Sequence, residues 1–233
     1  MLPQPKKHIP SIAPYPPGKP IEEVQREYGL KSVIKLASNE NPLGPSPKAV
    51  KAMLAAVKEM HLYPDGEGYY LKQALAQRHG VRPECIVLGN GSDEITDMVA
   101  TAYIAPANNI IVSQHDFISY NLAAQMMGAA CREVPLKDWR CDLNGMLKAA
   151  DDKTKLICIA NPSNPIGTMV RKKDLEAFLE KVPAHALILL DEAYAEYVSD
   201  RDYPNGSKYL RKFPNLIVTR TFSKAYGLAG LRI

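Results

Sequence analysis

The chain has 233 residues, 46% of them hydrophobic and 23% charged, which is the ordinary composition of a globular protein with a sizeable core. Its net charge of +4 comes from 29 basic and 25 acidic residues that are interspersed along the chain. The sequence has no basic block of the kind that favours nucleic acid or an anionic membrane, so we expect neither as a partner.

The cysteines and the N-terminal segment predict the compartment. The four cysteines form no CxxC pair, and two of them lie inside apolar runs, where a cysteine behaves as a small hydrophobe. This usage indicates a reducing compartment and no metal site. The N-terminal segment lacks the apolar stretch of a secretory signal, and no apolar run approaches the ~20 residues that cross a bilayer. We therefore expect a soluble, cytoplasmic protein.

The N-terminal segment predicts little regular structure. Residues 1–20 are rich in proline, which favours an extended arm outside any central sheet, with a frayed tail as the alternative. A short amphipathic helix over 21–28, ended by Gly29, and a short strand over 33–36 are expected next. The stretch 37–44 is by composition a turn.

Two helices are predicted after this turn. Ser46 and Pro47 form an N-cap and first-turn pair that begins the first helix. A proline–aspartate–glycine turn directly after Tyr63 separates it from the second helix, which stops at Gly80. Their apolar faces are expected at Val50, Met53, Leu54 and Val57, and at Tyr70, Leu71, Ala74 and Leu75.

The rest of the chain follows a regular alternation of apolar runs with helical or turn segments. Most of these runs are apolar on both faces, which predicts strands covered on both sides and therefore an α/β fold. In such folds the chemistry lies beyond the carboxyl ends of the strands. The runs lie near 85–88, 110–112, 131–134, 156–159, 186–190 and 216–219.

Lys224 lies in a narrow turn directly after the last apolar run. Small residues at 225, 227, 229 and 230 let the backbone pass close to a bound group. Hydroxyls at Thr221 and Ser223 and a cation at Arg232 surround a lysine that suits Schiff-base chemistry on an anionic, phosphorylated cofactor. The alternative is an exposed lysine in a loop of glycine and alanine.

Three further positions have a chemistry of their own. A glycine turn opens a helix near Ser92 and offers backbone N–H groups to a phosphate, although Ser92 is equally suited to an N-cap. Asn164 lies in a loop stiffened by two Asn-Pro steps, from which its amide can donate to a fixed acceptor. Asp191 ends a very apolar run and is costly to bury unless it meets a cation such as a protonated pyridine nitrogen; a helix N-cap is its alternative.

The segment Thr221–Arg232 resembles the cofactor-lysine signature of pyridoxal-phosphate-dependent aminotransferases of fold type I. Within them it is similar to the class II histidinol-phosphate aminotransferase family, and matching motifs extend from Asn39. The resemblance implies a large domain with a mostly parallel sheet and helices on both faces. It divides the chain into an N-terminal arm with the start of a small domain, 1–45, and an incomplete cofactor-binding domain, 46–233, without the C-terminal small domain.

The resemblance also implies residue roles around pyridoxal phosphate. Lys224, Asp191 and Tyr194 are implied to be catalytic, and Tyr194 shares the phenolic oxygen of the cofactor with Asn164. Phe117 stands where a tyrosine often stacks on the ring. Tyr63 is implied to reach the cofactor phosphate of a partner subunit, hence a homodimer. The remaining implied positions are Ser92, Asp93, Ser223 and Arg232 for the cofactor and Tyr15 and Asn41 for the substrate.

The activity implied is transamination between histidinol phosphate and 2-oxoglutarate in histidine biosynthesis, with freed Lys224 moving the proton. Related readings are an aromatic-amino-acid aminotransferase and a threonine-phosphate decarboxylase. Members of the family continue beyond the lysine motif into a small domain that supplies an arginine for the substrate carboxylate. A catalytically inactive fragment is therefore the third alternative for a sequence that stops at Ile233.

Overall fold

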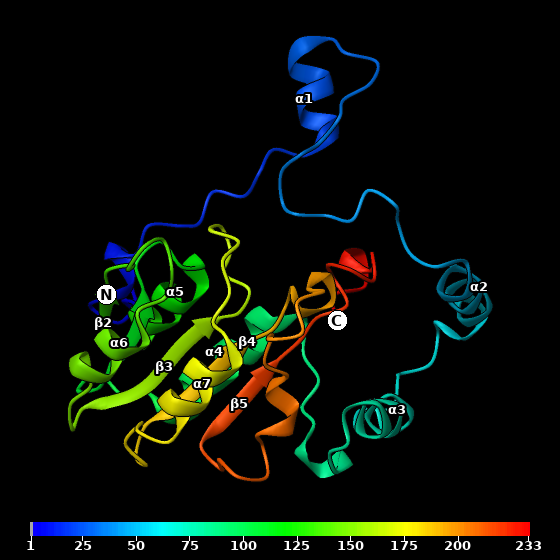
Figure 1. The fold of residues 1–233 in the computed structure, drawn as a ribbon. Helices are drawn as coiled ribbons and strands as arrows, with labels where there is room; N and C mark the ends of the chain where they lie inside the picture. The colour runs from blue at the N-terminus through cyan, green and yellow to red at the C-terminus, as the bar shows by residue number, and fades with distance from the viewer. Residues whose placement is uncertain (1) are drawn as a thin grey trace.

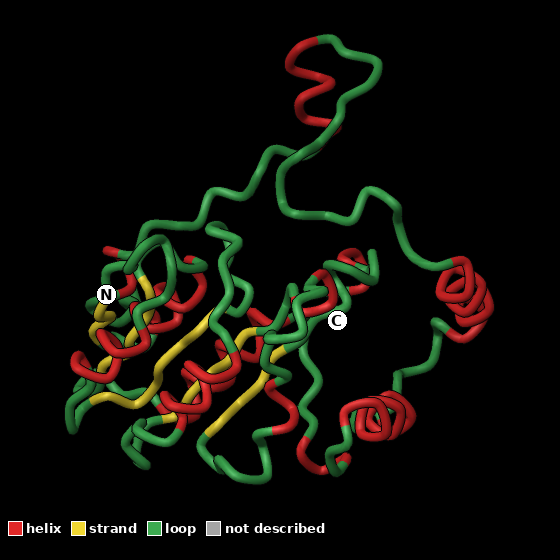
Figure 2. Tube along the Cα trace, in the orientation of Figure 1, coloured by secondary structure: helices red, strands yellow, loops and turns green. Residues whose placement is uncertain are grey.

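A computed structural model describes residues 2–233 and contains one five-stranded sheet, in which every strand pair is parallel. The strand order is β2-β1-β3-β4-β5, and Figure 2 shows the strands side by side. These strands confirm all but the first of the apolar runs predicted from residue 85 onward. They are β1 (Asn109–Ser113), β2 (Ala130–Val134), β3 (Thr154–Ala160), β4 (Leu187–Asp191) and β5 (Leu216–Thr219).

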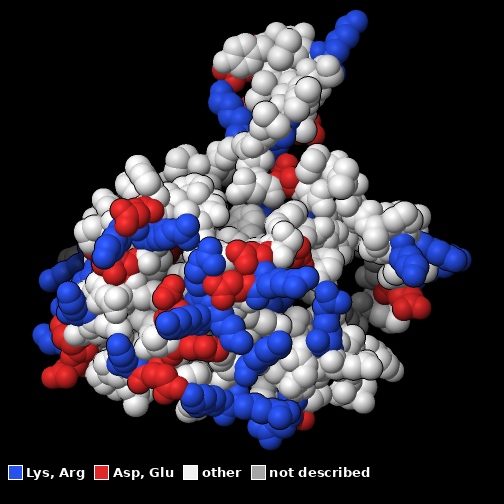
Figure 3. Space-filling view, viewed as in Figure 1, with Lys and Arg blue, Asp and Glu red and all other residues white. Residues whose placement is uncertain are grey.

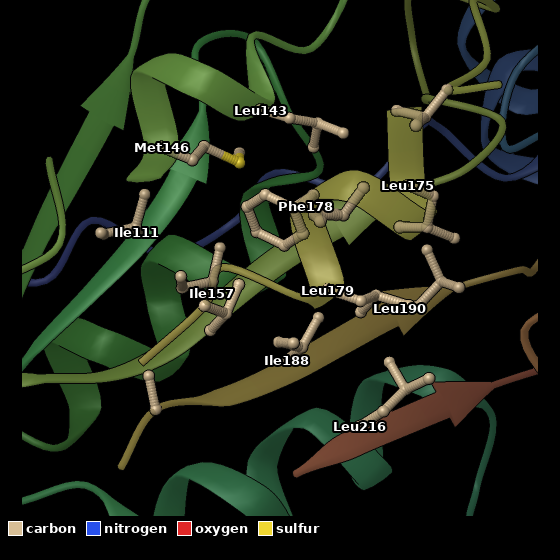
Figure 4. Packing of buried hydrophobic residues seen from close by; sticks show 14 of the residues in the cluster. Ile111, Leu143, Met146, Ile157, Leu175, Phe178, Leu179, Ile188, Leu190 and Leu216 are labelled. Atoms are coloured by element: carbon tan, nitrogen blue, oxygen red, sulfur yellow. The ribbon is translucent and has the colours of Figure 1, made fainter. Parts of the chain in front are cut away.

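Helices cover both faces of this sheet, as the two-sided apolar runs predict (Figure 1). Successive strand residues point to opposite faces, so Ile110 packs in the core beneath two of the helices and Ile111 in the core beneath the other two. Figure 4 shows the second core, where Phe178 lies over Ile157 and Ile188. The first pair is α4 (Ser92–Tyr103) and α5 (Ile118–Met126), and the second is α6 (Leu143–Ala149) and α7 (Lys172–Leu179).

The register aligns the carboxyl ends of the central strands. Ala160 at the end of β3 pairs with Asp191, and Asp191 pairs with Thr219 at the end of β5. The chain turns to opposite sides after β1 and β3, so the strand order reverses between these two strands. Ligands of open α/β sheets bind in the crevice at such a reversal.

The N-terminal arm lies outside the sheet, as predicted. Residues 2–20 have only one turn of 3₁₀ helix, at Ile9–Ser11, and α1 (Ile21–Tyr28) ends at Gly29, which has a left-handed φ of 63°. Figure 1 shows α1 standing apart from the sheet. His8 Nε2 lies 3.1 Å from the carbonyl oxygen of Met126 and connects the start of the arm to α5.

Both helices predicted after the arm form. Ser46 caps α2 (Pro47–Ala56) by accepting a hydrogen bond from the Ala49 amide at 3.2 Å, and α3 (Tyr69–His79) ends at Gly80 with a φ of 67°. The predicted apolar side chains of α2 are mostly exposed, among them Leu54, whereas Leu71 and Leu75 of α3 are half-buried. Figure 1 shows both helices beside the sheet, with loops between them.

The prediction of short strands over 33–36 and 85–88 is wrong, because neither stretch forms a strand. A strand forms only beside a partner that satisfies its backbone groups, and Ile34 and Leu36 are 89% and 91% exposed. Ile86 is extended, with φ −111° and ψ 125°. Its stretch is separated from the edge strand β5 by an apolar groove of about 370 Å³, and within the described residues it pairs with no strand.

The surface matches the balanced charge of the sequence. Figure 3 shows basic and acidic side chains interspersed over the face in view. None of the helices in residues 2–233 combines the length and apolar character needed to span a bilayer. The same residues contain no group of three His, Cys, Asp or Glu side chains placed to share a metal ion.

Candidate active site

A cavity of about 190 Å³ lies at the carboxyl ends of β1, β3, β4 and β5. It brings together every residue expected to bind the cofactor except Tyr63, from segments far apart in the sequence. Its position agrees with the strand-order reversal described above. The lining residues are Gly91, Ser92, Asp93, Phe117, Tyr120, Ala160, Pro162, Asn164, Asp191, Ala193, Tyr194, Thr221, Ser223, Lys224 and Arg232.

Hydrogen-bond donors that suit an anion gather around Gly91 in the cavity. Gly91 has a φ of 81°, and a Cβ there would lie 3.1 Å from Arg232 Nη2 and 4.0 Å from Ser223 Oγ. The Ser223 hydroxyl is buried without a hydrogen-bond partner among the described residues. The first turn of α4 adds free backbone N–H groups and the positive end of the helix dipole. The N-cap is Gly91, so the alternative reading of Ser92 as the cap is wrong.

Asp191, the last residue of β4, also lines the cavity. Its side chain is buried, with Oδ1 accepting from the Ala193 amide at 3.0 Å and Oδ2 from the Tyr120 hydroxyl at 2.7 Å. Burial raises the pKa of Asp191, and the hydrogen bond from Tyr120 lowers it. The next helical turn begins only at Ala195 and has Tyr194 as its N-cap, so the alternative reading of Asp191 as a helix cap is wrong.

Lys224 lines the cavity and is half-buried, which excludes the alternative of a freely exposed loop lysine. Burial lowers the pKa of its amine, while the carboxylates of Asp93 and Glu40 raise it. Nζ donates to the carbonyl oxygen of Ser38 at 3.0 Å and lies 5.7 Å from the centre of the Tyr194 ring. The amine therefore lies where a nucleophile would meet a group bound in the cavity.

Asn39 contacts two of the expected cofactor residues, a role that the sequence did not indicate. Its Nδ2 donates to Asn164 Oδ1 at 3.3 Å and to the Tyr194 hydroxyl at 3.0 Å. Asn41, the residue expected at the substrate, does not line the cavity and instead donates to the Ala225 carbonyl at 2.9 Å. Side chains two positions apart can point in different directions on an irregular segment. The motif alone therefore could not tell which of the two asparagines contacts the residues of the cavity.

Two expected tyrosines lie away from the cavity. Tyr15 is more than half exposed, and Tyr63 is fully exposed in the loop between α2 and α3. Neither lines the cavity of this chain. Phe117 does, and its ring meets the Tyr120 ring edge to face, with centres 6.2 Å apart and an interplanar angle of 81°.

A buried ion pair joins the residues that directly follow Asp191 at the end of β4 and Thr219 at the end of β5. Glu192 is fully buried, with Oε1 accepting from the Gly206 amide at 2.7 Å and Oε2 from Arg220 Nη2 at 2.5 Å. Arg220 also donates to Glu196 at 3.1 Å. Sequence reasoning missed this group, although a glutamate next to a buried strand end needs a cation.

Comparison with known proteins identifies the family. Residues 31–233 match the family model "Aminotransferase class I and II". The chain is 54% identical to histidinol-phosphate aminotransferase 2 of Hydrogenovibrio crunogenus, with 97% of the chain and 61% of that protein covered. It is 52% identical to histidinol-phosphate aminotransferase of Moorella thermoacetica, with 100% and 60% covered. The chain thus spans about three fifths of the length of these relatives.

The solved structures agree. Histidinol-phosphate aminotransferase from Sinorhizobium meliloti, solved in complex with pyridoxal-5′-phosphate, superposes with a TM-score of 0.90 at 33% identity, covering 100% of this chain and 62% of that one. The expected fold is therefore confirmed as the parallel-sheet large domain of fold type I transferases. With the family model extending over most of its length, the chain belongs to the class I and II aminotransferases.

Proposed function

We propose that this chain is the cofactor-binding part of a cytoplasmic, pyridoxal-phosphate-dependent aminotransferase that acts on histidinol phosphate with 2-oxoglutarate. The supporting observation is a single cavity that combines an anion site, a buried carboxylate and a lysine whose pKa is lowered by burial. The substrate assignment rests on relatives near 50% identity that are named histidinol-phosphate aminotransferase.

The residues present fit pyridoxal phosphate. The Ser223 hydroxyl, which has no partner among residues 2–233, the Arg232 guanidinium and the start of α4 are donors for its phosphate. Gly91 leaves room for the phosphate because it has no Cβ. Asp191 would hold the ring nitrogen and Phe117 the ring face. Asn164 and Tyr194 would hold the phenolic oxygen, in place of Asn39, and Lys224 would anchor the group covalently. Once bound, the cofactor supplies an electron sink for a carbanion at the substrate.

Lys224 is the proton carrier in this proposal. A lysine amine accepts a proton only when it is neutral, and burial lowers the pKa of Lys224 toward the range in which the neutral form is available. After the substrate amine has displaced Lys224 from the cofactor, the freed Nζ would take the proton from the α-carbon of the substrate and deliver it to the cofactor carbon that Lys224 had held. The hydrogen bond to the Ser38 carbonyl shows that Nζ can reach the N-terminal arm, from which Tyr15 and Asn41 would complete the substrate site.

A homodimer belongs to the same proposal. Tyr63 is fully exposed, and the apolar side chains of Leu54, in the neighbouring α2, and of Val57, directly after α2, are 68% and 55% exposed. Exposed apolar patches of this kind mark interaction surfaces. A second copy would cover them and bring Tyr63 to the phosphate end of the neighbouring cavity.

Reductive labelling tests the proposal. The protein at its natural length is loaded with pyridoxal phosphate, reduced with borohydride and mapped by peptide mass, with Lys35→Ala as the matched control for Lys224→Ala. We expect a label at Lys224 only, lost in Lys224→Ala and kept in the control. A label on another lysine with Lys224 free contradicts the assignment.

Substrate assays test the narrower reading. Histidinol phosphate, an aromatic amino acid and threonine phosphate are compared as substrates of the same preparation, with 2-oxoglutarate present. We expect kcat/KM to be highest for histidinol phosphate. Greater turnover of the aromatic amino acid, or release of carbon dioxide from threonine phosphate, supports the corresponding alternative. The structural likenesses to such enzymes, at 21% and 23% identity, show the fold alone.

A further inference from the structure

Tyr120 lines the deep wall of the cavity and touches two of the groups proposed to hold the cofactor ring. It belongs to α5 and is 1% exposed. Its hydroxyl donates to Asp191 Oδ2 at 2.7 Å, and its ring meets Phe117 edge to face. One buried side chain therefore contacts both the carboxylate and the aromatic ring of the site.

The hydroxyl of Tyr120 has Asp191 as its only hydrogen-bond partner in the part of the chain that the structure describes. Apolar residues of the same core surround it, among them Ala123 and Ala124, and the mostly buried carboxyl of Asp116 is the other carboxyl group close enough to act on it. A buried hydroxyl without an acceptor is costly. A backbone carbonyl would satisfy it equally well, so the choice of a titratable carboxylate needs an explanation beyond packing.

The charges around Asp191 favour its neutral form. Burial raises the pKa of Asp191 most, and the Asp93 carboxylate raises it further. Asp116, directly before Phe117 in the chain, is mostly buried, and this burial, together with the smaller effect of the Asp191 charge, raises its pKa to about 7. Among the influences that lower the pKa of Asp191, the hydrogen bond from Tyr120 is the largest, followed by the Ala193 amide. The phenol thus stabilises the anion against its surroundings.

We propose that Tyr120 is a positioning residue that keeps Asp191 ionised, so that the proton shared between Asp191 and the ring nitrogen of bound pyridoxal phosphate resides on the nitrogen. The inference rests on the proposed function. In a site of low dielectric the neutral pair of protonated acid and free nitrogen competes with the ionic pair. The two forms contain the same atoms and differ only in the place of one proton, which the Tyr120 hydrogen bond biases.

Tyr120→Phe isolates this effect. Phenylalanine keeps the ring, its packing in the core and the edge-to-face contact with Phe117, and it removes only the hydroxyl. A hydrogen bond to a charged group changes an equilibrium by about 10- to 100-fold. The variant should therefore shift the proton from the nitrogen toward Asp191 by about that factor.

The experiment measures the proton directly. Pyridoxal phosphate labelled with nitrogen-15 in its ring is bound to the protein at its natural length, and the chemical shift of the ring nitrogen is followed by NMR across pH. Asp191→Asn gives the reference for an unsupported nitrogen. Tyr209→Phe is the matched control, since Tyr209 also donates to a carboxylate, Glu176 Oε1 at 3.0 Å, on the other face of the sheet.

We expect a protonated nitrogen in the wild type and in Tyr209→Phe, and a shift toward the Asp191→Asn value in Tyr120→Phe. Equal shifts in Tyr120→Phe and the wild type, with cofactor bound in both, overturn this inference and leave the proposed function intact. A wild type that binds no pyridoxal phosphate overturns the proposed function and this inference with it.

Discussion

Arg220→Met is expected to destabilise the protein strongly, because it leaves a fully buried carboxylate without its cation. Glu192 would keep only the Gly206 amide as a hydrogen-bond donor, and Glu196 would lose its partner as well. Removing one member of a buried ion pair costs about 3–5 kcal/mol. Domains unfold with only about 5–15 kcal/mol, so this loss is a large share of the total.

The pH dependence of this loss has a definite sign. Burial raises the pKa of Glu192, and the Arg220 charge is the largest influence that lowers it. Without Arg220 the pKa in the folded state rises further, while that of the unfolded chain stays ordinary. A raised carboxyl pKa contributes stability below the unfolded value, and this is lost as pH rises through the folded value. The loss in Arg220→Met should therefore be larger at about pH 8 than at about pH 5.

Urea unfolding at the two pH values, with the same pyridoxal phosphate concentration throughout, measures these differences. Arg220→Met combined with Glu192→Leu removes both charges and should recover much of the loss, since apolar replacements of buried pairs are tolerated. Arg171→Met is the matched control, because the Arg171–Asp202 pair at 3.0 Å is exposed and screened by solvent. If Arg220→Met costs no more than Arg171→Met, or if its cost does not depend on pH, the reasoning is refuted.

Three further predictions concern the cavity. Ser223→Ala should weaken cofactor binding about 10-fold or more, measured by equilibrium dialysis, since it removes a donor that has no other partner among the described residues; unchanged affinity would place the phosphate elsewhere. Gly91→Ala should cost about 1 kcal/mol or more in urea unfolding, because alanine is strained at a φ of 81° and its Cβ meets Arg232; a stabilised variant contradicts the close approach. In the cofactor-free protein Lys224 should react with an amine reagent at a lower pH than exposed lysines do, since burial lowers its pKa. A reaction of Lys224 only at the same or a higher pH contradicts this.

The sequence by itself determined the fold class, the ends of several helices and the place of the cavity. Apolar runs on both faces predicted the covered parallel sheet, and cap residues such as Ser46, Gly29 and Gly80 predicted where helices begin and end. The motifs after the strands predicted the shared cavity, because parallel strands bring their carboxyl ends to one edge. Each of these inferences depends on neighbours within a few residues, which the sequence displays.

Only the tertiary structure decided the contacts between distant residues. Tyr120 lies 71 positions from Asp191 and looks like an ordinary core aromatic until the two meet. The pairing of Glu192 with Arg220 likewise joins the ends of two strands. The apolar stretches at 33–36 and 85–88 have strand composition but form no strand, since backbone pairing depends on a partner that composition cannot supply.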